Sequence, residues 1–195
     1  TVILASASPM RRALLERAGV MVTVDPARID EAEIRLGLEA DSARPRDVAE
    51  ALAEFKARKV SARHAGAVVL GCDQVLDCDG ARFDKVATMA EAATQLSRLQ
   101  GRTHTLHTAV VAFRDGAPIW RAVPGVKLTM RPLSEDDIAA YLAEAGETVL
   151  GAVGCYQFEG LGARLFTAYA GDYFSVLGLP LLPVLDFLRN QGLIR

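Results

Sequence analysis

Short apolar runs alternate along the chain with stretches whose apolar residues recur at helical spacing. Residues 2–5 form an apolar run typical of a buried strand, and a helix is predicted from Pro9 to about Ala18, ending at Gly19. Ser8 is a suitable N-cap, and Pro9 stands where the first turn of a helix tolerates proline. The chain therefore begins with a predicted strand, turn and helix.

Further elements follow from the same kinds of signal. Val48, Leu52 and Phe55 recur at helical spacing within 47–64, and residues 67–70 form a small-apolar run typical of a buried central strand. The remaining expected elements are strands at 20–24 and 105–113, a hairpin strand at 119–123, and helices at 88–100, 134–146 and 181–190. A segment punctuated by glycines, 151–178, shows no regular pattern.

These strands and helices alternate without strict strand–helix–strand regularity. The pattern predicts an α/β fold with a mixed, twisted sheet and flanking helices. A chain of 195 residues is long enough for one large domain or for two small lobes that share a core. Because the sequence contains no repeat, low-complexity tract or clear linker, we expect residues 1–195 to form a single domain.

Charge and composition exclude several classes of partner. The net charge is −2 and no basic stripe is visible, so we expect no nucleic-acid partner. No apolar stretch is long enough to span a membrane, so we expect no membrane partner. The three cysteines are odd in number and lack Cys-x-x-Cys spacing, which argues against a disulfide framework and favours a reducing, cytoplasmic location.

The first candidate for chemistry is the turn into the first helix. Ser6, Ser8, Arg11 and Arg12 converge there with the free amides of a helix N-terminus, and both amides and guanidinium groups favour phosphate. Arginine in a first helical turn opposes the helix dipole, which is easier to understand if an anion binds. A capped helix with a solvated basic first turn is the alternative.

The second candidate is Asp73, in the segment 71–74 that we expect at the carboxyl end of the buried run. Ligands of open α/β sheets bind outside the carboxyl ends of strands, where a carboxylate can hold a metal or activate water. The alternative is an aspartate that caps the following turn. Glu31 lies in an expected polar loop, and Glu31, Lys56 and Lys85, taken singly, are typical of solvated surface charges. His104 and His107 differ by three positions, so they cannot share a metal from one strand.

Together these segments resemble the Maf family of nucleotide pyrophosphatases, in the right order and over nearly the whole length. The matching segments are Leu4-Ala5-Ser6-Ala7-Ser8-Pro9, Arg11-Arg12-Ala13-Leu14-Leu15, Asp30-Glu31, Lys56-Ala57, Gly71-Cys72-Asp73-Gln74-Val75, Lys85, Gly101-Arg102-Thr103-His104, Glu159-Gly160-Leu161-Gly162 and Gly178-Leu179-Pro180-Leu181. The opening Ser-x-Ser-Pro block and the Gly-Leu-Pro-Leu block are specific.

The resemblance implies two lobes with a central cleft, similar to the inosine triphosphate pyrophosphatases, and a homodimer. It implies hydrolysis of a nucleoside triphosphate to a monophosphate and pyrophosphate, with Asp73 as the proton acceptor. It further implies that Glu31 and Asp73 hold a divalent metal, Mg²⁺ or Mn²⁺. The residues expected to bind the substrate are Ser6, Ser8, Arg11, Arg12, Lys56 and Lys85.

Three positions separate the branches of that family: Met10, Gln74 and Glu159. Glutamine and glutamate at the last two resemble the branch that acts on 7-methyl-GTP, although that branch often has an aromatic residue where this chain has Met10. The alternatives are a dTTP/UTP pyrophosphatase of the same family and a regulator that binds a nucleotide without hydrolysing it. A regulator would not need a water-activating carboxylate such as Asp73.

Overall fold

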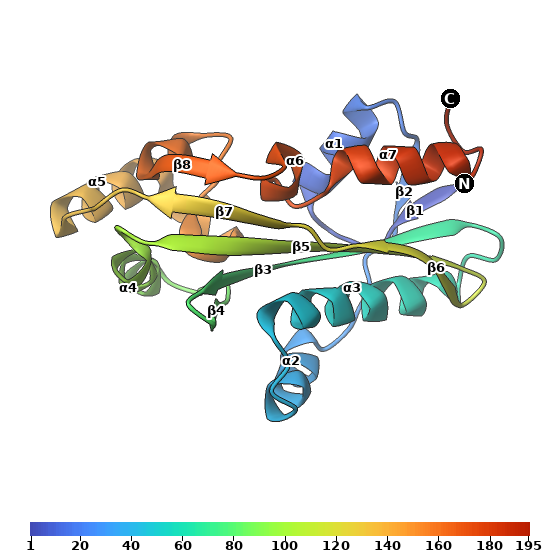
Figure 1. The fold of residues 1–195 in the computed structure, drawn as a ribbon, viewed down its shortest axis with the longest axis horizontal. Coiled ribbons are helices and arrows are strands. Elements are labelled where there is room, and N and C mark those ends of the chain that lie inside the picture. Colours follow the sequence, from blue (N-terminus) through green and yellow to red (C-terminus); the bar gives the residue numbers. More distant parts are fainter.

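Two long strands, β3 (Val68–Cys78) and β5 (Thr103–Arg114), run through the whole molecule and pair antiparallel (Figure 1). The structure is a computed structural model that describes residues 1–195. The main order of the sheet is β2-β1-β3-β5-β7-β8; β4 pairs with β3, and β6 pairs with β5. The other strands are β1 (Val2–Leu4), β2 (Val22–Val24), β4 (Ala81–Phe83), β6 (Ala117–Ala122), β7 (Gly125–Met130) and β8 (Phe166–Ala170).

The sheet is mixed, because β1 pairs parallel with both β2 and β3 while all other pairs are antiparallel. Helices cover both of its faces (Figure 1). They are α1 (Pro9–Arg17), α2 (Glu31–Ala40), α3 (Pro45–Ser61), α4 (Met89–Leu99), α5 (Glu135–Ala145), α6 (Tyr173–Val176) and α7 (Leu181–Asn190), with 3₁₀ turns η1 (Gly146–Gly151), η2 (Val153–Cys155) and η3 (Leu161–Leu165). The architecture is the mixed α/β fold that the sequence predicts.

Separate apolar cores divide the molecule into two lobes. One core packs α4, α5 and β7 around the Cys78 end of β3, with Leu96 and Leu128 fully buried. At the other end, α1 and α7 pack on one face of the sheet and α3 packs on the opposite face. Because β3 and β5 pass from one set of cores to the other, the lobes share a continuous sheet rather than a linker.

Several local predictions are confirmed. The Ser8 hydroxyl accepts a hydrogen bond from the Arg11 amide and caps α1, and Thr88 forms the predicted capping box with Glu91. The hairpin of β5 and β6 and the helix α7 are also present.

Cys72, Cys78 and Cys155 are buried free thiols. No helix of the structure is both long and apolar enough to cross a membrane.

Two expectations about the elements are wrong. The buried run does not end as a strand at Leu70, because β3 continues to Cys78 through pairing with β5. The polar segment at Glu31 is not a loop, because α2 begins there with Asp30 as its N-cap. The strands β4, β7 and β8 were not predicted at all, and β8 lies in the segment that showed no regular pattern.

Candidate active site

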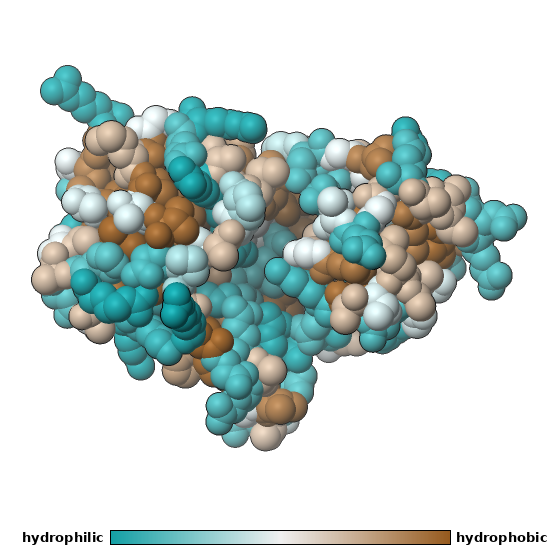
Figure 2. Space-filling model, turned by 180° about the vertical axis from the view of Figure 1, so that it is seen from behind, coloured by the Kyte–Doolittle hydropathy of each residue, from teal (hydrophilic) through white to brown (hydrophobic).

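The cleft between the lobes opens where β3 lacks a neighbour on one edge. Strand β1 pairs with Val68–Leu70, and β4 pairs only from Leu76 onward, so residues 71–75 between them have no strand on that side. The cleft has a volume of about 1070 Å³. Figure 2 shows this hollow with hydrophilic residues along its floor. It is lined by Ser6, Ser8, Met10, Arg11, Glu31, Lys56, Asp73, Gln74, Lys85 and Glu159, which are all of the predicted site residues except Arg12.

Side chains alternate between the two faces of β3, so Asp73 and Gln74 project to opposite faces. Asp73 lies on the face that α3 covers, with Lys56 beside it, whereas Gln74 lies on the face toward α6. Both reach the cleft because the edge of the strand is open between them. A single strand therefore supplies two chemically different ends of one cleft.

Gly71 allows α3 to approach β3 closely enough for the Asp73 site to form. A Cβ atom at this position would lie 2.1 Å from the Ala53 carbonyl oxygen and 2.6 Å from the Ala57 nitrogen. Gly71 and Asp73 share a face of the strand, and Lys56 precedes Ala57 on the helix. The bare backbone of Gly71 therefore brings the Lys56 side chain to Asp73.

Lys56 joins two carboxylates at this point. Its Nζ donates to Asp73 Oδ1 at 2.8 Å and lies 2.8 Å from Glu31 Oε1. Asp73 and Lys56 are 4% and 8% exposed, so their charges require one another. The second oxygen, Asp73 Oδ2, is buried and accepts no hydrogen bond. A buried carboxylate oxygen with an unused lone pair beside a cleft is suited to hold water or a cation.

Glu31 is kept ionised by the surrounding cations. Burial raises the pKa of its carboxyl group, but the hydrogen bond from Lys56 and the charges of Lys56, Arg35 and Lys85 outweigh that effect and hold the pKa below its usual range. Glu31 and Asp73 form a pair of carboxylates, and the chain has no cluster of three or more histidine, cysteine or acidic ligands. Any metal held here would need further oxygen ligands from a bound molecule or from water.

Arg11 closes the open edge of β3 at the start of α1. Its guanidinium donates to Ser6 Oγ at 2.9 Å, to the Gly178 carbonyl at 2.8 Å and to the Cys72 carbonyl at 3.4 Å. A Cβ atom on Gly178 would lie 3.4 Å from Arg11 Nε, and this glycine has a φ of +104°, so a side chain there would be strained and crowded. The Ser-x-Ser-Pro block and the Gly-Leu-Pro-Leu block of the sequence thus meet at Arg11.

The structure places Arg12 and Lys85 differently from Arg11. Arg12 is exposed, forms an ion pair with Glu16 at 2.7 Å on its own helix, and does not line the cleft. Successive helical residues are turned by about 100°, so Arg11 and Arg12 cannot face the same side. Lys85 lines the rim of the cleft. Partial loss of hydration and the charge of Arg11 lower the pKa of the Lys85 ammonium.

At the other end of the cleft, the hydrogen-bond network determines how Gln74 is oriented. Its amide group faces the carbonyl oxygens of Ser175 and Val176 at 3.0 and 3.2 Å and the Thr108 hydroxyl at 3.0 Å. The Thr108 hydroxyl donates its own proton to the Ser175 carbonyl, so all three partners of the Gln74 amide are acceptors. Only the NH₂ group of Gln74 can face them. Its carbonyl oxygen, Oε1, is therefore the free acceptor of a residue that lines the cleft.

Sequence reasoning missed several residues of the cleft. Phe158 lines it beside Glu159 and contacts the rings of Phe166, Tyr169 and Tyr173. Arg35, Arg82 and Asp84 line it near Asp73. The only available signal for Phe158 was its place next to Glu159. Arg35 offered none, because a single arginine in a polar segment is typical of a solvated surface.

The histidines behave as expected. His104 is buried and shares a 2.7 Å hydrogen bond with the Tyr156 hydroxyl, whereas His107 lies on the other side of β5, 3.4 Å from Asp77. Burial lowers the pKa of His104 to about 4. The two residues share no ligand site.

A family model described as Maf-like protein matches residues 1–191. The chain belongs to the Maf family. It is 50% identical over 190 residues to a protein of Paramagnetospirillum magneticum named nucleoside triphosphate pyrophosphatase, covering 97% of this chain and 98% of that one. It is 48% identical over 192 residues to a 7-methyl-GTP pyrophosphatase of Rhizobium etli, covering 98% and 96%.

The fold of this Maf protein is shared beyond the family. A HAM1 protein from Coxiella burnetii superimposes with a TM-score of 0.54, covering 97% of this chain and 98% of that one. The sequence identity is only 16%, so the likeness concerns the fold alone. It agrees with the predicted two-lobed architecture.

Proposed function

We propose that this Maf protein hydrolyses a nucleoside triphosphate to a nucleoside monophosphate and pyrophosphate. The observation that carries the proposal is the buried Oδ2 of Asp73, which accepts no hydrogen bond, in a cleft that also presents Arg11, Lys56 and Lys85. Relatives named nucleoside triphosphate pyrophosphatase match nearly the whole chain. A binding protein without turnover would have no need for a free buried carboxylate oxygen beside its cations.

The residues suit an in-line attack of water on the α-phosphorus. Asp73 Oδ2 accepts a proton from, or orients, the attacking water. Lys56 binds Asp73 Oδ1 and places positive charge beside the reacting phosphate. Arg11 and Lys85 offset the charge that develops on the phosphate oxygens and on the pyrophosphate leaving group. Positioning and electrostatic stabilisation dominate phosphoryl transfer, and this cleft supplies both.

The same end of the cleft fits a divalent cation. Mg²⁺ commonly binds through one or two carboxylates together with substrate phosphates, and Asp73 Oδ2 with Glu31 would supply the carboxylates. When bound, the metal would polarise the phosphate and lower the pKa of a bound water. Lys56 lies between the two carboxylates, so it would turn toward a phosphate when they bind a metal.

The end of the cleft at Gln74 and Glu159, here called the base end, favours a guanine nucleotide. Gln74 Oε1 is a fixed acceptor, and Glu159 adds a carboxylate at the rim of the same cleft. The Watson–Crick edge of guanine presents two adjacent donors, whereas uracil and thymine present one donor between two carbonyls. Phe158 offers an aromatic face that can stack on a positively charged 7-methylguanine ring, the role that Met10 cannot fill. We therefore propose 7-methyl-GTP or a related modified purine as the preferred substrate.

A panel of nucleoside triphosphates, standard and modified, tests both levels of the proposal. Pyrophosphate release is measured with Mg²⁺ and with Mn²⁺ for each substrate. The largest kcat/KM is expected for 7-methyl-GTP, and no activity on any triphosphate would overturn the proposed reaction. A parent enzyme that prefers dTTP or UTP would overturn the base assignment alone.

A double variant sharpens the base assignment. Gln74→Thr with Glu159→Gln removes the fixed acceptor and the carboxylate together, so the preference is expected to shift toward dTTP and UTP. Sites built on hydrogen-bond complementarity reject partners that leave polar groups unpaired.

The homodimer that the resemblance implies stays a prediction, which light scattering of the purified protein would check.

A further inference from the structure

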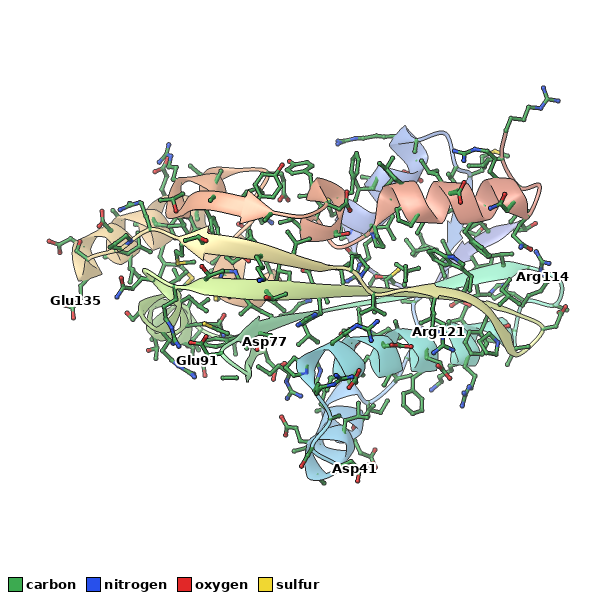
Figure 3. All side chains as sticks on the ribbon, viewed as in Figure 1. Asp41, Asp77, Glu91, Arg114, Arg121 and Glu135 are labelled. Carbon is green, nitrogen blue, oxygen red and sulfur yellow. The ribbon has the colours of Figure 1, made fainter.

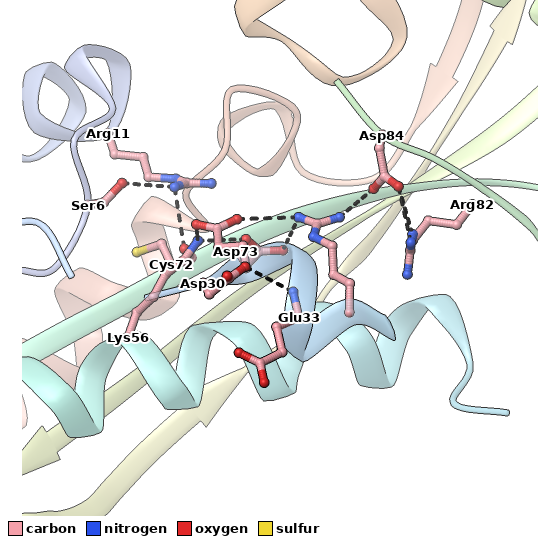
Figure 4. Close-up of polar contacts among 11 residues, drawn as sticks. Ser6, Arg11, Asp30, Glu33, Lys56, Cys72, Asp73, Arg82 and Asp84 are labelled. Carbon is pink, nitrogen blue, oxygen red and sulfur yellow. Dashed lines mark hydrogen bonds and ion pairs between the residues drawn. The ribbon is translucent and has the colours of Figure 1, made fainter. Parts of the chain in front are cut away.

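Arg35 stands among three carboxylates in the cleft. Its Nη1 donates a hydrogen bond to Asp84 Oδ1, while Nη2 lies 3.6 Å from Glu31 Oε2 and 3.8 Å from Asp73 Oδ2. Its side chain is only 17% exposed. Figure 4 shows Asp84 and Arg82 on one side of Asp73, with Arg11 and Ser6 on the other. Arg35 therefore lies on the opposite side of the reacting centre from Arg11.

Ion pairs hold the Arg35 side chain in this place, while half-buried Ile34 and Leu38 of the same helix pack against the core around α3. Helix α2 has no buried residue, and it projects from the body of the protein toward Asp41 (Figure 3). Asp84 accepts from Arg35 and also pairs with Arg82 at 3.1 Å, and Arg82 in turn pairs with Glu39 on α2. Two arginines from opposite walls thus share Asp84 and tie α2 to the end of β4.

The two terminal nitrogens of Arg35 are used unequally. Nη1 is committed to Asp84, but Nη2 approaches Glu31 and Asp73 at distances beyond hydrogen-bond range. A guanidinium carries five donors in a rigid fork and matches phosphate oxygens well. Nη2 is therefore a donor without a hydrogen-bond acceptor, and it lies beside Asp73 Oδ2, which accepts no hydrogen bond. A cation bound by Glu31 and Asp73 would replace Arg35 Nη2 as the partner of these carboxylates.

We propose that Arg35 is a substrate-binding residue: Asp84 holds its Nη1, and Nη2 binds a phosphate oxygen of the metal-bound triphosphate. This inference rests on the proposed function, since it places the polyphosphate between Arg11 and Arg35. Asp84 fixes the orientation of the Arg35 guanidinium. Arg35 neutralises Glu31 and Asp73 in the free enzyme and turns to the phosphate when those carboxylates bind metal.

Binding of inorganic tripolyphosphate separates this role from others, because the probe lacks a base and is independent of turnover of a nucleotide. Affinity is measured by calorimetry in the presence of Mg²⁺. Arg35→Gln should weaken binding by roughly 10- to 100-fold, the usual loss for a hydrogen bond to a charged group. Arg121→Gln is the matched control, because Arg121 also joins two elements through an ion pair, with Glu50 at 2.6 Å, but is not among the residues that line the cleft.

Arg35→Lys guards against misfolding of the glutamine variant. It keeps the charge but loses the fork, so its affinity for tripolyphosphate should lie between that of Arg35→Gln and the parent. Unchanged affinity in both Arg35 variants would overturn the proposal. A lower melting temperature with unchanged affinity would show that Arg35 has a purely structural role. A lower kcat with unchanged affinity would show that Arg35 only positions Asp73. Either result overturns the proposal.

The outcome is distinguishable from failure of the proposed function. If the parent releases pyrophosphate from nucleotides but Arg35→Gln binds tripolyphosphate as the parent does, only the role of Arg35 fails. If the parent binds tripolyphosphate through Arg35 but hydrolyses no nucleotide, only the reaction fails. A parent that does not bind tripolyphosphate at all overturns the role of Arg35 directly.

Discussion

The two ends of the cleft are built from opposite faces of one strand, yet they are held by different forces. At the phosphate end, Asp73, Lys56 and Arg35 belong to a network of ion pairs in which charges of both signs alternate. At the base end, Gln74 is fixed by neutral hydrogen bonds, and His104 is bonded to Tyr156 deep in the lobe behind it. Neither His104 nor Tyr156 has an ion pair.

This difference has a functional consequence. If a triphosphate and a metal bind as proposed, they would rearrange the ion pairs of the phosphate end, so the residues there would exchange partners during binding. The base end is already set, because only the NH₂ group of Gln74 can donate to the acceptors around it. Substrate choice should therefore depend on a preformed site, and catalysis on a rearranged one.

Removing the free carboxylate tests the phosphate end most severely. Asp73→Asn should lower kcat by roughly 10²–10⁴-fold, the usual cost of losing a positioned general base. The amide nearly preserves shape, but it removes a proposed metal ligand and leaves Lys56 paired only with Glu31, so some loss of melting temperature and of affinity for tripolyphosphate is expected, and both are measured beside kcat. Pyrophosphate release under saturating substrate measures the effect. Activity within a few-fold of the parent would make Asp73 structural and would remove the main contrast between the two ends.

The neutrality of the His104–Tyr156 pair, in the lobe behind the base end, can be tested through pH. Burial lowers the pKa of His104 from 6.5 to about 4, so the unfolded chain takes up a proton in this range that the folded protein refuses. Stability is thus fully present above pH 6.5 and falls as the pH drops toward 4, by roughly 3 kcal/mol from this one group. Urea unfolding of the parent and of His104→Gln at pH 7.5 and pH 5 gives the two differences in stability.

His104→Gln should lose less stability than the parent between those two pH values, whatever its stability at pH 7.5. All other titrating groups are common to the two proteins, so the comparison isolates His104. An equal fall in both proteins would show that His104 does not stay neutral when buried.

Crowding α3 against β3 should damage the phosphate end and spare the base end. Gly71→Ala introduces a Cβ into the backbone of α3, which should cost about 1–3 kcal/mol of stability and move Lys56 away from Asp73. Chemical denaturation and kcat measure the two effects. Gly37→Ala is the control, because a Cβ there meets nothing within 4 Å on helix α2. Loss of substrate discrimination without loss of kcat would contradict the division of labour.

The smallest effect is expected from the aromatic ring at the base end. Phe158→Leu keeps an apolar side chain but removes the ring face, so the preference for 7-methyl-GTP over GTP should fall by roughly 3- to 30-fold, as expected for a cation–π contact. The ratio of the two kcat/KM values measures it. Tyr169→Leu is the matched control, since Tyr169 contacts Phe158 but does not line the cleft. A similar loss in both variants would point to packing rather than to contact with the base.

Local signals in the sequence were sufficient for much of the fold and for part of the site. Ser8 caps α1, Thr88 and Glu91 cap α4, and α7 has its predicted bounds, because each feature depends on residues within a few positions of one another. The order of the motifs likewise indicated the Maf family.

Long-range contacts decided the rest. Strand β3 continues past Leu70 because β5, about thirty to forty residues further along the chain, pairs with it through Asp77. Helix geometry and the meeting with Gly178 brought Arg11 to the cleft and left Arg12 in solvent. The orientation of the Gln74 amide depends on carbonyl groups about a hundred positions later in the chain. Arg35 gains its place from Asp84 on the other wall. Such contacts have no signature at the residue itself, because their energy comes from partners that only the folded chain brings together.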